Sequence, residues 1–369
     1  MSDSVSNMHI CLVGPIPPPA GGMANQTRQL KALLQQDGAT VELVAVNAPY
    51  RPAFAGRIVG LRALFRLVPY IINLYQAVGR AQVVHIMANS GWSWHLFAAP
   101  AIWISYLRRT PVIVNYRGGH AETFFAASWR KVQFSLRHAS AVLVPSAFLQ
   151  QVFAGYDQPS AIVPNILDHT LFYPASAPKA EPVTAPHFIV TRNLEAIYDV
   201  ATAVKAFELV YQQYPQAKLT IAGTGPLLAQ LQQQVQQSGL TQAVSFAGRL
   251  DTTQMAELYR SADIMLNSSL VDNSPNSVIE AMACGVPVIS TNVGGIPRLV
   301  TDKIDALLTE QGDYQTMFTY AKQLLASPEL RQQLVQNGLL NSGRFHWQIV
   351  GSQLAGHYNS AIRAMEHRA

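Results

Sequence analysis

The chain has 369 residues, 49% hydrophobic and 13% charged, with a formal net charge of +5. One hydrophobic core rarely grows to this size, so we expect two domains of a well-buried α/β protein. The basic residues are scattered, without interleaved aromatic residues or a DNA-binding pattern, which argues against a nucleic-acid partner. The two cysteines, Cys11 and Cys284, lack the spacing of a metal site or disulfide framework and fit a reducing cytoplasm.

No segment has the pattern of a secretion signal or a membrane-spanning helix. The first seven residues are polar, and the apolar run Ile10–Val13 is too short for a signal core. The most apolar window, Trp92–Leu107, contains His95 and Pro100 and is shorter than the ~20 residues that cross a bilayer. We therefore expect a cytoplasmic protein.

Charge is uneven along the chain. Residues 1–170 carry 13 Lys and Arg against 6 Asp and Glu, whereas residues 171–369 carry 13 against 15. The basic first half is therefore the part expected to meet an anionic partner or surface.

The first strand is predicted over Met8–Gly14, followed by a proline-rich loop and a helix over Met23–Leu34. Gly21 and Gly22 lie at this strand-to-helix junction, where glycines let the backbone approach a ligand closely. A plain turn is the other interpretation.

Further strands are predicted at Val41–Val46, Val83–Met87, Val112–Tyr116 and Ala141–Val144, with helices between them. This alternation predicts a doubly wound parallel sheet, whose ligands bind beyond the carboxyl ends of the strands. The candidate ligand-binding residues at that edge are Asn89, Ser90, Arg117, Gly118, Gly119 and His120. Arg117 could hold a phosphate through two hydrogen bonds, and His120 could move or orient a proton, or be a plain exposed loop residue.

The segment Gly56–Arg80 places four arginines among apolar residues, and Pro69 is expected to divide it into two helices. A basic, amphipathic surface of this kind suits docking on anionic lipid. An ordinary core-facing helix with solvated arginines remains the alternative.

Residues 173–186 are rich in proline and alanine, which is typical of an interdomain linker. A strand predicted over His187–Thr191 then begins a second alternation of strands and helices. Leu219–Pro226 is a strand followed by a turn with Gly223 and Gly225. That turn lacks the third glycine and the later acidic residue of a dinucleotide fingerprint.

The stretch Asp263–Arg298 predicts a strand, a polar loop, a helix over Asn276–Cys284 and a second strand over Val286–Ser290. Its loop, Asn273-Ser274-Pro275-Asn276, offers two side chains that can cap the helix and a proline suited to the first turn. Backbone N–H groups at a helix start favour an anion. Two carboxylates, Asp272 and Glu280, flank this loop and could grip sugar hydroxyls, although both could also be merely solvated.

Residues 272–288, together with Gly294-Gly295-Ile296-Pro297, resemble the Glu-x7-Glu signature of retaining glycosyltransferases of family 4, which have the GT-B fold. The first acid is Asp here. The resemblance is dense from Arg192 to Arg298 and looser before it.

The resemblance implies a set of binding roles. Asp272 would contact the donor sugar, Glu280 the ribose, and Arg192 the diphosphate, while the family's lysine is replaced near Tyr198. Backbone groups around Gly248 would meet the nucleobase. The residues expected to bind the diphosphate or line the donor site are Gly223, Gly225, Asn273, Ser274, Pro275, Asn276, Ser277 and Val278. Members of the family often have a histidine after the fourth strand, near the sugar that is transferred. In this sequence Arg117 or His120 would take that role.

For the whole chain the resemblance implies two Rossmann-like domains facing across a cleft: an acceptor-binding domain over 1–172 and a nucleotide-sugar domain over 187–345. A C-terminal helix over 346–369 would cross back to the first domain or form a dimer contact.

The expected activity is retaining transfer from a nucleotide-diphosphate sugar to a glycan or polyprenyl-linked acceptor in cell-envelope or exopolysaccharide biosynthesis. No cofactor and no metal are expected, since an Asp-x-Asp motif is absent from the sequence. Peripheral contact with the inner face of the plasma membrane is a further expectation. The alternatives are a non-catalytic sugar-nucleotide-binding subunit and a nucleotide-sugar epimerase.

Overall fold

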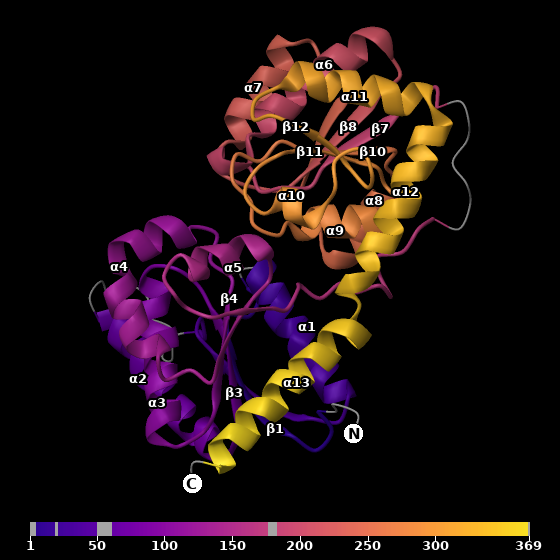
Figure 1. The fold of residues 1–369 in the computed structure, drawn as a ribbon. Coiled ribbons are helices and arrows are strands. Elements are labelled where there is room, and N and C mark those ends of the chain that lie inside the picture. The colour runs from indigo at the N-terminus through magenta and orange to yellow at the C-terminus, as the bar shows by residue number, and fades with distance from the viewer. Residues whose placement is uncertain (1–4, 19–20, 50–60, 176–182, 368–369) are drawn as a thin grey trace. The chain divides into compact units, whose positions relative to one another are not determined.

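The computed structural model describes residues 5–18, 21–49, 61–175 and 183–367, and for residues 61–64 only the backbone (Figure 1). The described chain forms two compact units. The N-terminal unit comprises residues 1–166 together with the C-terminal segment Trp347–Ala369, and the second unit comprises Leu167–His346. Half of the predicted linker, residues 173–186, falls on residues 176–182, which lie outside the described part.

The N-terminal unit is built on a six-stranded parallel sheet with the order β2-β1-β3-β4-β5-β6. Its strands are β1 (His9–Gly14), β2 (Thr40–Ala45), β3 (Val83–Ala88), β4 (Val112–Tyr116), β5 (Ala141–Val144) and β6 (Ala161–Ile162). Its helices are α1 (Gly22–Gln36), α2 (Leu61–Arg80), the π-helix η2 (Trp94–Ala98), α3 (Ala99–Leu107), α4 (Ala121–Leu136), α5 (Ala147–Ala154) and α13 (Trp347–Glu366).

Two hydrophobic cores cover the two faces of this sheet because alternate strand residues point to opposite sides. Cys11 and Val84 point into the core under α2 to α5, whereas Ile10 and Val83 point into the core under α1 and α13. The last helix, α13, therefore packs on the first sheet (Figure 1).

The second unit repeats this architecture, with the strand order β12-β11-β10-β7-β8-β9. Its strands are β7 (His187–Val190), β8 (Lys218–Ala222), β9 (Val244–Gly248), β10 (Ile264–Asn267), β11 (Val288–Thr291) and β12 (Leu307–Thr309). Its helices are the 3₁₀ turn η3 (Ala196–Tyr198), α6 (Val200–Gln213), α7 (Leu228–Gln237), α8 (Thr252–Ser261), α9 (Asn276–Ala283), α10 (Ile296–Leu299), α11 (Tyr314–Ala326), α12 (Pro328–Ser342) and the 3₁₀ turn η4 (Gly343–Phe345).

The strand order of each sheet reverses at one point. In the second unit β7, β8 and β9 run outward, and the chain then returns to place β10 beside β7. In the N-terminal unit the reversal lies between β1 and β3. Ligands of open parallel sheets bind at such switch points, beyond the carboxyl ends of the strands.

Two details differ from the sequence-based expectations. Helix α2 continues through Pro69 instead of dividing there. Pro69 is exposed while Tyr70, Leu74 and Val78 pack into the core, so packing of the opposite face offsets the hydrogen bond that the proline lacks. The two short edge strands, β6 and β12, were not expected because runs of two or three residues carry little periodic signal. The part of the basic segment Gly56–Arg80 up to residue 60 lies outside the described residues.

None of the described helices is both long enough and apolar enough to cross a membrane.

Candidate active site

Arg192 and Asp272 meet at the switch point of the second sheet. Arg192 follows β7 and Asp272 follows β10, two strands that are neighbours in the sheet although 80 residues separate the side chains in sequence. The Arg192 guanidinium donates from Nη2 to Asp272 Oδ2 and, at 3.2 Å, from Nη1 to Ser277 Oγ. Both side chains of the ion pair are only 12% exposed. The site therefore holds a largely buried ion pair at the position where parallel sheets bind ligands.

Tyr198 provides a third support for Arg192. Its ring lies 4.1 Å from the guanidinium carbon, in the geometry of a cation–π contact. Tyr198 stands in the neighbourhood where the resemblance noted in the sequence implies a lysine, and Lys205 instead lies over the Tyr314 ring at 5.7 Å. The aromatic ring therefore supports Arg192 and does not itself add a cation.

One donor of Arg192 is left unpaired. Its Nε is buried and has no hydrogen-bond partner within the described chain. A buried, unpaired donor is costly and uncommon in native proteins, and an anionic ligand oxygen would satisfy it.

Asp272 is held by its own loop as well as by Arg192. Its Oδ1 accepts from the Asn273 amide at 2.9 Å, and Ser269, which Asn267 and Thr291 anchor in the core, donates weakly to Oδ2 at 3.4 Å. Burial nevertheless raises the pKa of Asp272 above its usual value, against the lowering effects of Arg192, Asn273 and Ser269. The carboxylate is thus positioned rigidly at an energetic cost.

Glu280 lies on α9, partly exposed, about one turn after the start of the helix. Tyr259, which is fully buried on α8, donates its hydroxyl to Glu280 Oε2 at 3.2 Å and pairs with the Thr191 hydroxyl at 2.8 Å. Burial raises the pKa of Glu280 to about 7, while Tyr259 and Arg192 pull it down. Tyr259 was missed from sequence because no local motif surrounds it.

The start of α9 differs from the expected capped helix. Pro275 occupies the N-cap position, and its own side chain makes no capping hydrogen bond. The candidate residues Asn273, Ser274, Pro275 and Asn276 therefore present this helix start mainly through their backbone. Ser277 is buried and binds Arg192, and the Val278 side chain belongs to the hydrophobic core, so only its backbone lies at the site.

Four glycines let neighbouring loops pack directly on the two loops that carry the site, the one after β7 and the one after β10. A Cβ at Gly223 would lie 2.0 Å from the Arg192 carbonyl oxygen, and one at Gly225 would lie 2.4 Å from that of Leu194. A Cβ at Gly294 or Gly295 would lie 2.1 or 1.8 Å from the carbonyl oxygens of Asp272 and Asn273 respectively. In this unit the glycines act by close backbone packing. Gly248 differs, since it ends β9 with a φ of +67° and open space where a Cβ would be.

In the N-terminal unit the candidate residues follow β1, β3 and β4. Gly21 caps α1, where a Cβ would meet open space, and Gly22 begins that helix. Asn89 accepts from the Ser90 amide, and Ser90 pairs with the Tyr116 hydroxyl at 2.7 Å. A Cβ on Gly118 would collide with Ser90 at 2.2 Å, whereas Gly119 and the N-cap residue His120 are exposed. These loops form a group at the carboxyl edge of the first sheet.

Arg117 ends a buried chain of polar side chains. It donates to Asn115 Oδ1 at 3.2 Å and to Asn165 Oδ1, and Asn115 Nδ2 lies 3.3 Å from His85 Nε2. His85 Nδ1 in turn lies 2.8 Å from the hydroxyl of Tyr358 on α13. Since Asn115 donates to Nε2, the His85 proton sits on Nδ1 and is donated to Tyr358. Burial, with a smaller effect of Arg117, lowers the pKa of His85 to about 3, and burial lowers that of Arg117 to about 10.

Comparison with known proteins identifies the family of these two units. The model of "Glycosyltransferase Family 4" matches residues 20–171, and the model of "Glycosyl transferases group 1" matches residues 175–340, so together they span most of the chain. The solved structure of HepE from Anabaena, in complex with UDP and glucose, superposes with a TM-score of 0.73 at 18% identity, covering 96% of this chain and 100% of that one. This likeness, together with the two parallel sheets, confirms the predicted GT-B fold.

Curated relatives match over shorter stretches. A D-inositol 3-phosphate glycosyltransferase of Segniliparus rotundus is 26% identical over 229 residues, 60% of this chain and 51% of that protein. An N-acetyl-alpha-D-glucosaminyl L-malate synthase of Bacillus anthracis is 34% identical over 142 residues, 38% of this chain and 36% of that protein. The chain thus spans about half or less of the length of these curated relatives.

Proposed function

The chain belongs to glycosyltransferase family 4, and from this premise we propose that it transfers a sugar from a nucleotide-diphosphate sugar to a glycan or lipid-linked glycan acceptor. The observation that carries the proposal is the Arg192–Asp272 pair at the switch point, with Glu280 on the helix that starts beside it. HepE, which shares this fold, was solved with UDP and glucose.

Each group has a chemical task in this proposal. The Arg192 guanidinium and the start of α9 bind the diphosphate and stabilise the charge that it gains as the bond to the sugar breaks. Asp272 accepts hydrogen bonds from the donor sugar. Glu280 accepts from the ribose, since Tyr259 occupies only Oε2. The acceptor oxygen attacks the anomeric carbon, and its proton passes to the departing phosphate.

Thermal stabilisation by nucleotides tests the donor site. A ligand that binds only the folded state raises the melting temperature, so one of UDP, GDP or ADP, or its sugar conjugate, should shift the melt. Glu280→Ala should abolish the shift, while Glu257→Ala, an exposed carboxylate on α8, should leave it unchanged. The proposal fails if no nucleotide shifts the melt, or if both variants behave alike.

We propose that transfer retains the configuration of the donor sugar, as the resemblance of the Asp272 to Glu280 segment implies. An α-linked donor should then give an α-linked product, which the anomeric coupling constant in a proton NMR spectrum reports directly. A β-linked product would contradict retention and leave the transferase proposal standing. Nucleotide binding without any product would favour the non-catalytic subunit, and an isomerised sugar nucleotide would favour the epimerase.

We also propose that transfer needs no divalent metal, because Arg192 and the start of α9 supply positive charge for the diphosphate. The rate in excess EDTA should equal the untreated rate. A loss of rate that Mg²⁺ or Mn²⁺ restores would overturn this proposal.

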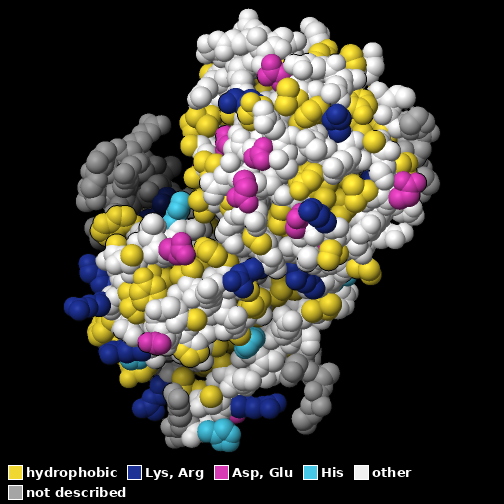
Figure 2. All heavy atoms as spheres, turned by 45° about the horizontal axis from the view of Figure 1, so that its top comes forward, with side chains coloured by type: hydrophobic (Ala, Val, Ile, Leu, Met, Phe, Trp, Pro, Cys, Tyr) yellow, Lys and Arg dark blue, Asp and Glu magenta, His cyan; other side chains and the backbone are white. Residues whose placement is uncertain are grey.

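We propose peripheral contact with an anionic membrane through α2. Val68, Ile71, Ile72 and Tyr75 form a stripe of exposed apolar side chains at helical spacing, and Arg108 lies over the Tyr75 ring at 4.5 Å. On the face drawn in Figure 2, basic side chains lie among apolar ones. The excess of Lys and Arg in residues 1–170 complements anionic lipid.

Sedimentation with lipid vesicles tests this contact. The protein should sediment with phosphatidylglycerol vesicles, less at high salt, and little with phosphatidylcholine. Ile72→Ser with Tyr75→Ser should weaken sedimentation, whereas Leu340→Ser, which is 78% exposed on α12, should not. Equal binding by the two variants would contradict the assignment.

A role in envelope or exopolysaccharide assembly predicts that deletion of the gene removes a surface glycan of its host.

A further inference from the structure

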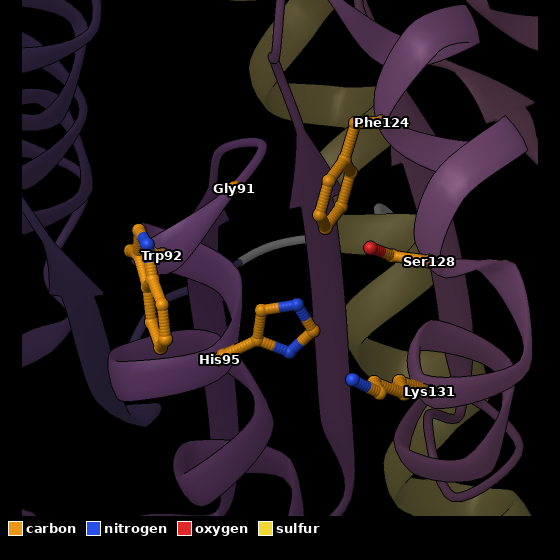
Figure 3. Close-up of a pocket in the computed structure, with 6 residues that line it drawn as sticks. All are labelled: Gly91, Trp92, His95, Phe124, Ser128 and Lys131. Carbon is orange, nitrogen blue, oxygen red and sulfur yellow. The ribbon is translucent and has the colours of Figure 1, made fainter.

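A pocket of about 340 Å3 lies in the N-terminal unit, between the loop that follows β3 and helix α4 (Figure 3). Its lining residues are Gly91, Trp92, His95, Phe124, Ser128 and Lys131. The volume suits one monosaccharide-sized ligand, at the small end of known binding sites. The loop and the start of α4 follow the carboxyl ends of β3 and β4, the edge at which parallel sheets bind ligands.

Local structure aims these side chains at one another. Phe124, Ser128 and Lys131 are spaced by four and three residues, so they share one face of α4. On the other side Gly91 turns the chain with a φ of +68°, and the π-helix η2 begins three residues later. Short π-helices inside α-helices are frequent at functional sites. Figure 3 shows the Trp92 and Phe124 rings on either side of His95, with the Lys131 amine and the Ser128 hydroxyl directed into the pocket.

The pocket combines aromatic rings with a positively charged side chain. The His95 ring centroid lies 6.3 Å from that of Trp92 and 5.8 Å from that of Phe124, both near edge-on. Trp92 is 77% exposed, a large apolar surface that folding leaves in water. Burial, and then the charge of Lys131, lower the pKa of His95, so its neutral ring can exchange hydrogen bonds with hydroxyls. No Asp or Glu is among the lining residues, which leaves Lys131 as the lining charge.

We propose that this pocket binds an acidic sugar of the acceptor, with the apolar face of the ring against Trp92 and Phe124 and the anionic group on Lys131. Aromatic rings offer apolar area and a polarised face to the C–H side of a pyranose. The anionic group is a carboxylate, as in a uronic acid, or a phosphate ester. Binding of the acidic sugar stands on the pocket alone, and its assignment as acceptor rests on the proposed function.

Calorimetric titration of the nucleotide-free, full-length protein with three probes tests the binding. Methyl β-glucuronide carries the carboxylate, glucose 6-phosphate the phosphate, and methyl β-glucoside no charge. One of the acidic probes should bind about tenfold or more tightly than the neutral probe, because charged hydrogen bonds are the strong ones. Whichever acid binds identifies the source of the charge. Equal affinity for all three, or no binding, overturns the proposal.

Matched variants locate the site. Lys131→Gln should remove the preference for the acidic probe, whereas Arg130→Gln, the loss of the same charge on the neighbouring exposed residue, should keep it. Trp92→Ala should weaken both acidic and neutral probes, and Leu107→Ala, 74% exposed outside the pocket, should weaken neither. A Lys131 variant that matches the Arg130 variant overturns the assignment.

Nucleotide binding at the donor site is measured independently of sugar binding in the pocket. Nucleotide stabilisation should be the same in Lys131→Gln and wild type, since the candidate donor residues lie in the other unit. If the acidic probe binds at Lys131 and no nucleotide binds, the proposed function fails and the sugar site stands. If the acidic probe binds yet neither accepts sugar nor slows transfer, its assignment as the acceptor is overturned.

Discussion

Arg192 connects several side chains of the candidate site, because it contacts Asp272, Ser277 and Tyr198 at once. Arg192→Gln leaves the Asp272 carboxylate buried without its partner. Removing one member of a buried pair costs roughly 3–5 kcal/mol, so we expect a loss of about 3 kcal/mol in the free energy of unfolding at pH 8, together with loss of nucleotide stabilisation.

Urea denaturation checks this prediction, and the double variant Arg192→Gln with Asp272→Asn is its control. The neutral amide needs no cation, so the double variant should recover part of the lost stability. A double variant whose loss equals the sum of the two single losses would show that the pair is not coupled.

Glu280 should make stability depend on pH in a defined direction. Its pKa in the folded protein is raised from 4.5 to about 7, so between these values the folded state binds more protons than the unfolded state. The free energy of unfolding therefore falls as pH rises from about 4.5 to 7, by about 3 kcal/mol from this group, one pKa unit being roughly 1.4 kcal/mol.

Urea midpoints at pH 5 and pH 7.5 measure the effect, with Glu280→Gln as the reference, because the amide still accepts a hydrogen bond from Tyr259. The wild type should lose more stability than the variant over this interval. Parallel behaviour of the two proteins would mean that Glu280 titrates normally.

Among the elements, the loop Val293–Gly295 sets the position of the Asp272 turn. Gly295 has a φ that any residue adopts, yet a Cβ there would lie 1.8 Å from the Asn273 carbonyl oxygen. Gly295→Ala should therefore displace the turn, lower the melting temperature by several degrees and weaken nucleotide stabilisation. Gly343→Ala, where a Cβ meets nothing within 4 Å, is the matched control and should be close to neutral. Similar behaviour of the two variants would contradict the packing argument.

Helix α13 is tied to the first sheet by a hydrogen bond as well as by apolar packing. Tyr358→Phe removes the acceptor of the His85 Nδ1 proton inside the core, which should cost about 1–3 kcal/mol in the free energy of unfolding. Urea denaturation gives the value, with Tyr106→Phe as control because that side chain is 51% exposed. An unchanged free energy of unfolding in Tyr358→Phe would mean that the hydrogen bond between His85 and Tyr358 does not stabilise the protein.

For the whole molecule, the described hydrophobic clusters each belong to one unit. Because the candidate donor site lies in the second unit, the bound nucleotide should raise the unfolding temperature of that unit and leave that of the N-terminal unit unchanged. Differential scanning calorimetry should then resolve two transitions, of which one moves with nucleotide. A single transition that moves as a whole would show that the units unfold together.

Local patterns in the sequence predicted the parallel sheets, and the resemblance of residues 272–297 to glycosyltransferase family 4 implied the GT-B fold. Apolar runs and glycine turns are local signals, and they located the longer strands and the stretch from Asp272 to Gly295 that carries the family resemblance. The candidate roles of Asp272, Glu280, Arg192 and the remaining site residues stay predictions until nucleotide binding is measured.

The tertiary structure alone decided which side chains meet. The Arg192–Asp272 pair spans 80 residues, and Tyr259 reaches Glu280 from another helix. His85 and Tyr358, 273 residues apart, face each other only because α13 packs on the first sheet. Such pairings leave no mark in a single sequence, because each partner alone looks like an ordinary core or surface residue. The N-cap position of Pro275 at the start of α9 and the unbroken α2 have the same cause, since packing of the whole unit overrides local preference.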